Sequence, residues 1–98
     1  MSTGTIESRS PQDQSDVVVS VPAADRETVA GAFKRAREAF PEWSRSALAR
    51  ADALVGAADA LNAAKDDVVE LMVREVSKPL TESVMEHCRA VRILRYQA

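Results

Sequence analysis

The residues best suited to chemistry in this chain are His87 and Cys88, which are adjacent near its C-terminal end. A cysteine beside a base can act as a nucleophile once its thiol is deprotonated. However, neighbouring positions of a helix point in different directions, and Cys88 falls on an apolar helical face with Val84 and Val91. Free cysteine behaves as a small buried hydrophobe. We therefore predict that Cys88 is a packed structural thiol and that His87 lies at the surface or at an interface.

A short basic row could bind an anion, because Arg89, Arg92 and Arg95 recur at i,i+3. A phosphate or nucleic-acid site is one interpretation of this row. A solvated face near the C-terminus of a helix, favoured by the helix dipole, explains it more simply. The net charge of −2, from 13 basic and 15 acidic residues, also lacks the basic excess of a protein that neutralises nucleic-acid phosphates.

Sites for other ligands have little support in the sequence. His87 has no second ligand at metal-binding spacing. The glycines, Gly4, Gly31 and Gly56, are isolated, so neither a G-x-G-x-x-G fingerprint nor a P-loop is present. The chain therefore cannot bind a dinucleotide by that route.

Composition indicates one small, mainly helical unit. Ninety-eight residues suffice for one small domain, and the Ala, Leu, Arg and Glu content favours helices over an all-β fold. The single cysteine cannot form an internal disulfide and suggests a reducing compartment. We see no signal peptide and no apolar run of membrane-spanning length, so we expect a soluble cytoplasmic protein with no membrane partner.

The N-terminal part of the chain predicts one strand or two. Residues 1–15 are polar and are expected to be mobile. Residues 16–21 contain consecutive valines, which favour extended backbone, and Pro22 ends the run. This strand needs a neighbour, either from residues 8–15 or from elsewhere.

A first helix is predicted after Asp25, which can cap it. One face carries apolar side chains at helical spacing, namely Val29, Phe33, Ala36 and Phe40. Pro41 should stop this helix, because proline has no N–H to donate. Trp43 then lies in the connection, and we expect it to anchor the helix on the rest of the fold with Phe33 and Phe40.

Two more helical segments follow. Ser44 or Ser46 can cap the second, and residues 62–67 interrupt its apolar pattern, so a kink or break is expected there. The pattern then resumes, with a Glu70–Arg74 pair at i,i+4. Pro79 ends this segment and can begin the next. The third segment has an apolar face formed by Leu80, Val84, Cys88, Val91 and Leu94 or Arg95.

The order of these features resembles the N-terminal part of the aldehyde dehydrogenase superfamily. Arg-Ser-Pro at 9–11, leading to the valines at 17–18, is similar to its opening turn and strand. Ala-Arg-Glu-Ala-Phe-Pro-Glu-Trp at 36–43 looks like its Ala-Arg-x-Ala-Phe-x-x-Trp segment. The Arg-containing helix at 50–61, Glu-Val-Ser-Lys-Pro-Leu-Thr-Glu at 75–82 and Arg-Tyr-Gln-Ala at 95–98 also follow in order. Ser77 replaces a usual glycine, so this turn must avoid positive φ or tolerate strain. Gln97 stands where a second tyrosine is usual.

The resemblance implies that residues 16–98 are the incomplete N-terminal hairpin and helical part of an α/β, Rossmann-like enzyme. Such enzymes oxidise an aldehyde to a carboxylic acid with NAD or NADP, through a cysteine thiolate, hydride transfer and hydrolysis of a thioester. Their catalytic residues and nucleotide-binding core lie in later sequence, and no nucleophile motif surrounds Cys88. We therefore expect this chain to hold no catalytic residue and no cofactor, and to be inactive alone.

Two residues of the Lys-Pro turn need separate interpretation. In some family members an acidic residue at the position of Glu75 helps to bind a structural monovalent cation. With a single candidate ligand, a helix-end carboxylate paired with a neighbour is the simpler interpretation, and the metal question is open. Lys78 invites a catalytic role, but we expect it at a helix junction.

The expected partner is the missing remainder of the enzyme, or a second copy bound through the apolar helix faces. The alternative function is a small, non-enzymatic helical module for interaction or dimerisation.

Overall fold

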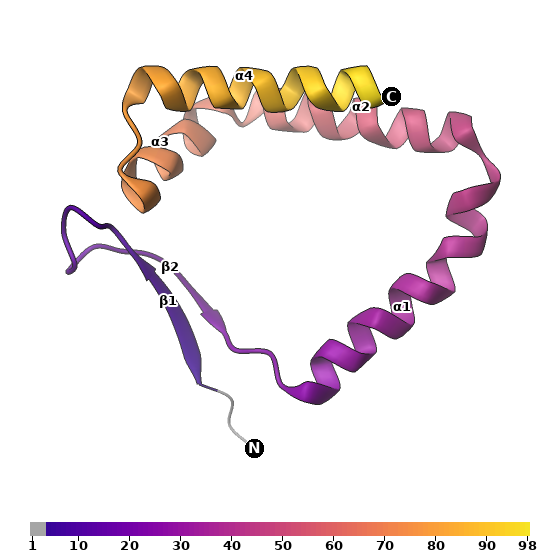
Figure 1. Cartoon of the computed structure of the whole chain (residues 1–98), viewed down its shortest axis with the longest axis horizontal. Coiled ribbons are helices and arrows are strands. Elements are labelled where there is room, and N and C mark those ends of the chain that lie inside the picture. Colours follow the sequence, from indigo (N-terminus) through magenta and orange to yellow (C-terminus); the bar gives the residue numbers. More distant parts are fainter. Residues whose placement is uncertain (1–3) are drawn as a thin grey trace.

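The computed structural model describes residues 4–98. Within them, a hairpin and four helices follow one another around an open ring (Figure 1). The radius of gyration is 17.3 Å and the extents are 47 × 42 × 15 Å. A compact domain of this length has a radius of gyration of about 13 Å. The elements therefore form one flat layer, in which Ala58, Val69 and Val91 are the buried apolar residues of the described part.

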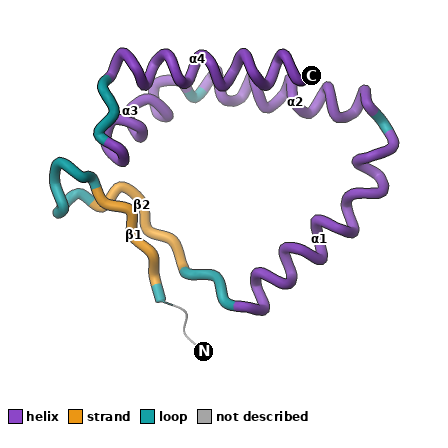
Figure 2. Tube along the Cα trace, in the orientation of Figure 1, coloured by secondary structure: helices purple, strands orange, loops and turns teal. Residues whose placement is uncertain are grey.

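The hairpin pairs β1 (Thr5–Arg9) with β2 (Val17–Pro22) in antiparallel register (Figure 2). The valine-rich strand thus finds its neighbour in the N-terminal segment. This differs from the expectation that residues 1–15 are a mobile segment, because residues 5–9 are hydrogen-bonded to β2. Residues 1–3 of that segment lie outside the described residues.

Helix α1 (Arg26–Arg45) begins as predicted and ends later than predicted. The Asp25 carboxylate accepts a hydrogen bond of 2.7 Å from the Thr28 N–H, which confirms the cap. The prediction that Pro41 stops the helix was wrong, since α1 continues through Trp43 to Arg45. Proline removes one backbone donor. The helix tolerates this loss because it has no buried residue, so water can reach the carbonyl left without a donor.

The predicted break in the second helical segment is confirmed. Helix α2 (Ala47–Ala63) is capped by Ser46, whose hydroxyl accepts from the Ala49 N–H at 3.1 Å. Ala64 leaves helical geometry with φ −89° and ψ 16°, and α3 (Lys65–Val76) follows. Ser77 then ends α3 in the left-handed region, with φ 54° and ψ 33°. The serine at the position where the resemblance leads us to expect glycine therefore adopts a conformation that glycine favours.

Helix α4 (Leu80–Gln97) lies along α2, and the two form the most extensive contact between helices of the ring (Figure 1). Its buried residues are Ser83, His87 and Val91. Of the apolar face predicted for this segment, Val91 is buried as expected, whereas Leu80 is exposed. The fold is mainly helical with two short strands, as predicted. None of the helices in residues 4–98 is long and apolar enough to cross a membrane.

Candidate functional site

The structure reverses the predicted roles of His87 and Cys88. His87 is only 1% exposed, and its Nε2 lies 2.7 Å from the carbonyl oxygen of Leu61. Because that carbonyl can only accept, Nε2 carries the hydrogen and donates it. Cys88 is exposed, so the prediction of a packed thiol was wrong.

The physical reason lies in the rotation of α4 against α2. Positions of a helix are about 100° apart, so a small rotation exchanges which of two neighbouring residues is buried. Leu61 is in the last turn of α2, where carbonyls lack intrahelical partners. His87 supplies a donor to that turn, and this hydrogen bond could not be read from helical periodicity. The imidazole thus joins α4 to the end of α2, and it is not placed as a base for Cys88.

A second polar contact closes the ring between the hairpin and α3. Arg74 Nη2 donates to Asp16 Oδ1 at 2.6 Å, and Nε donates to Oδ2 at 3.2 Å. This two-point pair replaces the predicted Glu70–Arg74 pair. The hydrogen bonds from Arg74 lower the pKa of Asp16 below its ordinary value. The same contact raises the pKa of Arg74.

Glu75, which the resemblance suggested as a possible cation ligand, contacts the hairpin. Ser8 Oγ donates to Glu75 Oε1 at 2.9 Å, so Glu75 is a helix-end carboxylate paired with a neighbour. Within residues 4–98, no group of three or more His, Cys, Asp or Glu side chains could hold a metal ion. Together with the Asp16–Arg74 pair, the Ser8–Glu75 hydrogen bond joins the hairpin to α3.

The remaining cationic candidates lie along α4. Lys78 is at the α3–α4 junction, as predicted, and pairs with Glu86. Arg95 pairs with Asp59 of α2 at 3.3 Å. Arg89 and Arg92 line a shallow groove of about 770 Å³ along the second half of α4.

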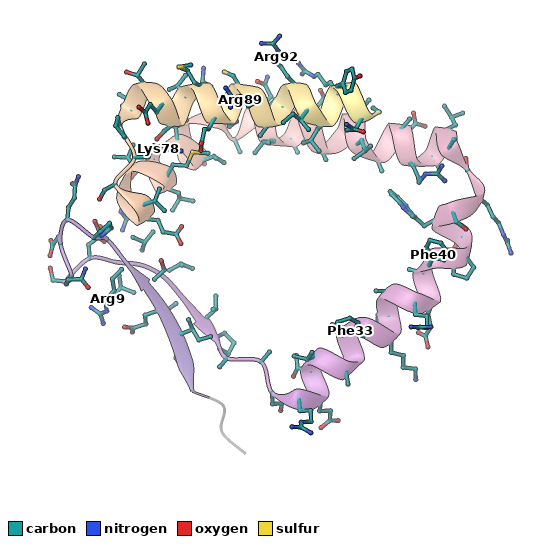
Figure 3. All side chains as sticks on the ribbon, in the orientation of Figure 1. Arg9, Phe33, Phe40, Lys78, Arg89 and Arg92 are labelled. Atoms are coloured by element: carbon teal, nitrogen blue, oxygen red, sulfur yellow. The ribbon has the colours of Figure 1, made fainter. Side chains whose placement is uncertain are left out.

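The aromatic side chains of α1 are not an anchor within this chain. Phe33 is 74% exposed, Phe40 is 63% exposed and Trp43 is 48% exposed. In Figure 3, Phe33 and Phe40 stand on α1 with no other element packed against them. The prediction that they hold α1 to the rest of the fold was therefore wrong for the described residues. The apolar face that the periodicity predicts does exist, but it is uncovered.

Comparisons with known proteins bear on this uncovered face. A family model described as "Aldehyde dehydrogenase family" matches residues 1–98. A 1-pyrroline-5-carboxylate dehydrogenase of Geobacillus kaustophilus is 35% identical over 97 residues, covering 98% of this chain and 19% of that protein. The enzyme of the same name from Staphylococcus saprophyticus is 30% identical over 95 residues, covering 96% and 18%. An N-succinylglutamate 5-semialdehyde dehydrogenase of Salmonella agona is 42% identical over 64 residues, covering 64% and 13%. The chain spans less than a fifth of the length of the relatives that it matches.

Proposed function

This chain belongs to the aldehyde dehydrogenase family, and from this we propose that it is a scaffold segment of an NAD(P)-dependent enzyme that oxidises an aldehyde to a carboxylic acid. The segment contributes a hairpin and four helices that pack on the remainder of the enzyme. It supplies no catalytic side chain, and by itself it is inactive. The same proposal places it in the cytoplasm, where the exposed thiol of Cys88 would stay reduced.

The observation that carries the proposal is the uncovered apolar face of α1. Phe33 and Phe40 are each more than 60% exposed, and α1 has no buried residue. A contiguous apolar face of this kind marks an interaction surface. The relatives are more than five times longer than the aligned segment, so they contain ample polypeptide to cover such a face.

The polar chemistry of the described residues supports a scaffold rather than a reaction centre. Cys88 has no base directed at it, because His87 turns its Nε2 to the Leu61 carbonyl. Two polar contacts, Asp16–Arg74 and Ser8–Glu75, join elements of the segment to one another. These contacts stabilise the arrangement of the elements, and none of them activates a nucleophile among the described residues.

Activity measurements test the first half of the proposal. The purified 98-residue chain is mixed with 1-pyrroline-5-carboxylate or N-succinylglutamate 5-semialdehyde, the substrates in the relatives' names, and with NAD or NADP. We expect no reduced nicotinamide to form. Steady formation of NADH or NADPH by the chain alone would show that it carries a reaction centre and would overturn the scaffold role.

Binding measurements test the second half. The partner is the Geobacillus kaustophilus relative from which the aligned segment has been deleted. We expect the wild-type chain to bind it and to restore aldehyde oxidation. The double variant Phe33→Asp/Phe40→Asp should not bind, because two charges would enter an apolar contact. Lys34→Asp is the matched control, since Lys34 faces solvent beside Glu38 and its substitution should leave binding unchanged. If the wild-type chain fails to bind, or if the phenylalanine variant binds equally well, the docking role of α1 is refuted.

A further inference from the structure

The corner where α1 meets α2 is bridged by the side chain of Arg50 (Figure 1). Arg50 lies in the first turn of α2. Its Nη1 donates hydrogen bonds to the carbonyl oxygens of Trp43 and Ser44, at 3.1 and 3.0 Å. Both carbonyls belong to the last turn of α1, where carbonyls lack intrahelical partners. A guanidinium group of α2 therefore caps the C-terminal end of α1.

Electrostatics favour this cap. The C-terminal end of a helix carries partial negative charge, and a guanidinium group is always positively charged in a protein. Hydrogen bonds from a charged donor are stronger than those between neutral groups. Arg50 is partly buried, and among the described residues it takes part in no ion pair. Its charge therefore acts on the end of α1.

Little else holds α1 at this corner. Ser46 is the single residue between the two helices, so rotation about its φ and ψ swings α1 as a rod. Within residues 4–98, no other side-chain hydrogen bond joins α1 to α2, and α1 has no buried residue. At its other end, residues 23–25 link α1 to the hairpin without regular structure. The two hydrogen bonds of Arg50 are thus well placed to oppose rotation at Ser46.

A small rotation at Ser46 has a large effect on the apolar face of α1. Phe33 lies 13 positions before Ser46. At a rise of about 1.5 Å per residue, this separation is about 20 Å along the helix. A dihedral change of about 20°, the ordinary scatter of backbone angles, would move Phe33 by about 7 Å. A contact made by Phe33 and Phe40 therefore depends on how firmly the corner is held.

We propose that Arg50 is a positioning residue that fixes the orientation of α1 relative to α2, so that the apolar face of α1 is presented for docking before the remainder of the enzyme binds. The docking part rests on the proposed function, whereas the fixed corner is a property of this chain alone. A surface already held in its bound orientation loses less conformational freedom on association, which strengthens binding. Arg50 acts through α1, because its guanidinium is committed to the α1 carbonyls.

The spread of distances between α1 and α2 tests the fixed corner. Spin labels are attached to Lys34→Cys on α1 and Ala60→Cys on α2, both exposed positions, in the full chain with Cys88→Ser. Pulsed electron paramagnetic resonance then gives the distance distribution between the labels. We expect a single narrow distribution for the chain with Arg50. Arg50→Ala should broaden it by about 6 Å, because Lys34 is nearly as far from Ser46 as Phe33 is.

Two variants separate positioning from a general loss of structure. Arg45→Ala is the matched control, since it removes an exposed guanidinium at the same corner that makes no hydrogen bond among the described residues. It should leave the distribution narrow. Arg50→Lys keeps a charged donor and should restore most of the narrowness. Circular dichroism should show equal helix content throughout, because alanine and lysine are both good helix formers. A distribution that is broad with Arg50, or as narrow with Arg50→Ala, would overturn the proposal.

Binding to the truncated Geobacillus kaustophilus relative tests the docking part. Arg50→Ala should raise the dissociation constant by about 10-fold, through lost pre-organisation, and Arg45→Ala should leave it unchanged. Equal affinity of Arg50→Ala and wild type, despite a broadened distribution, would refute the presentation of α1 for docking. If the wild-type chain itself does not bind, the proposed function fails. The distance measurement would still decide the role of Arg50 at the corner, since it needs no partner.

Discussion

The hydrogen bond from His87 to α2 yields the sharpest stability prediction. His87→Leu fills much of the same volume but removes the donor that reaches the Leu61 carbonyl at 2.7 Å. Because His87 is 1% exposed, water cannot readily replace that donor. Leaving a buried acceptor unsatisfied costs about 1–3 kcal/mol, so the free energy of unfolding should fall by that amount.

Cys88→Ala is the matched control for this prediction. Cys88 is the next residue of α4 and is exposed, so truncating it should change the free energy of unfolding by no more than about 0.5 kcal/mol. His87→Gln should fall between the two, because its amide retains a donor. The measurement is urea unfolding followed by the helical circular dichroism signal.

Two outcomes would refute the reasoning about His87. Equal losses for His87→Leu and Cys88→Ala would show that the buried hydrogen bond contributes nothing. A larger loss of unfolding free energy for Cys88→Ala than for His87→Leu would support the sequence-based prediction that the thiol is the packed residue. Nitrogen chemical shifts give an independent check, since Nε2 should carry the hydrogen and Nδ1 should not.

Two further predictions concern the C-terminal end of α3. Ser77→Gly should stabilise the chain by about 1 kcal/mol in the same urea assay, because Ser77 holds φ 54°, a conformation that strains residues with a Cβ. Destabilisation would show that the serine side chain matters more than the backbone strain. Asp16→Asn should weaken the contact between the hairpin and α3 above pH about 4 and should matter less in acid. The Arg74 contact lowers the pKa of Asp16. The stability that this ion pair contributes is therefore present above the ordinary carboxyl pKa and is lost as the pH falls through the lowered value. Thermal midpoints of wild type and variant should therefore converge on acidification, and a constant difference down to pH about 2 would contradict this assignment.

Local signals in the sequence were enough to predict most helix boundaries. Asp25 and Ser46 cap α1 and α2 as expected, because each side chain needs only an N–H three residues away. The break near Ala64 was predicted from the interrupted apolar pattern. Pro41 was the exception, since an exposed helix can lose one hydrogen bond and continue. The family membership also followed from the order of short motifs.

The candidate site was harder to predict, because its contacts join distant positions. Asp16 and Arg74 are 58 positions apart, and nothing local marks them as partners. Arg74 had a nearer candidate in Glu70, and the ring geometry decided between them. Which of His87 and Cys88 is buried was hard to predict for the same reason, since it depends on which of two adjacent helical positions the partner helix covers.

What the sequence by itself determined is the set of elements, their caps and the family to which the chain belongs, because these depend on neighbours along the chain and on motif order. Only the tertiary structure decided which faces of those elements are covered. It buried His87 against the end of α2, exposed Cys88, and left Phe33 and Phe40 without a partner. The physical reason is that periodicity shows that a face is apolar, whereas burial depends on whether another element lies against it.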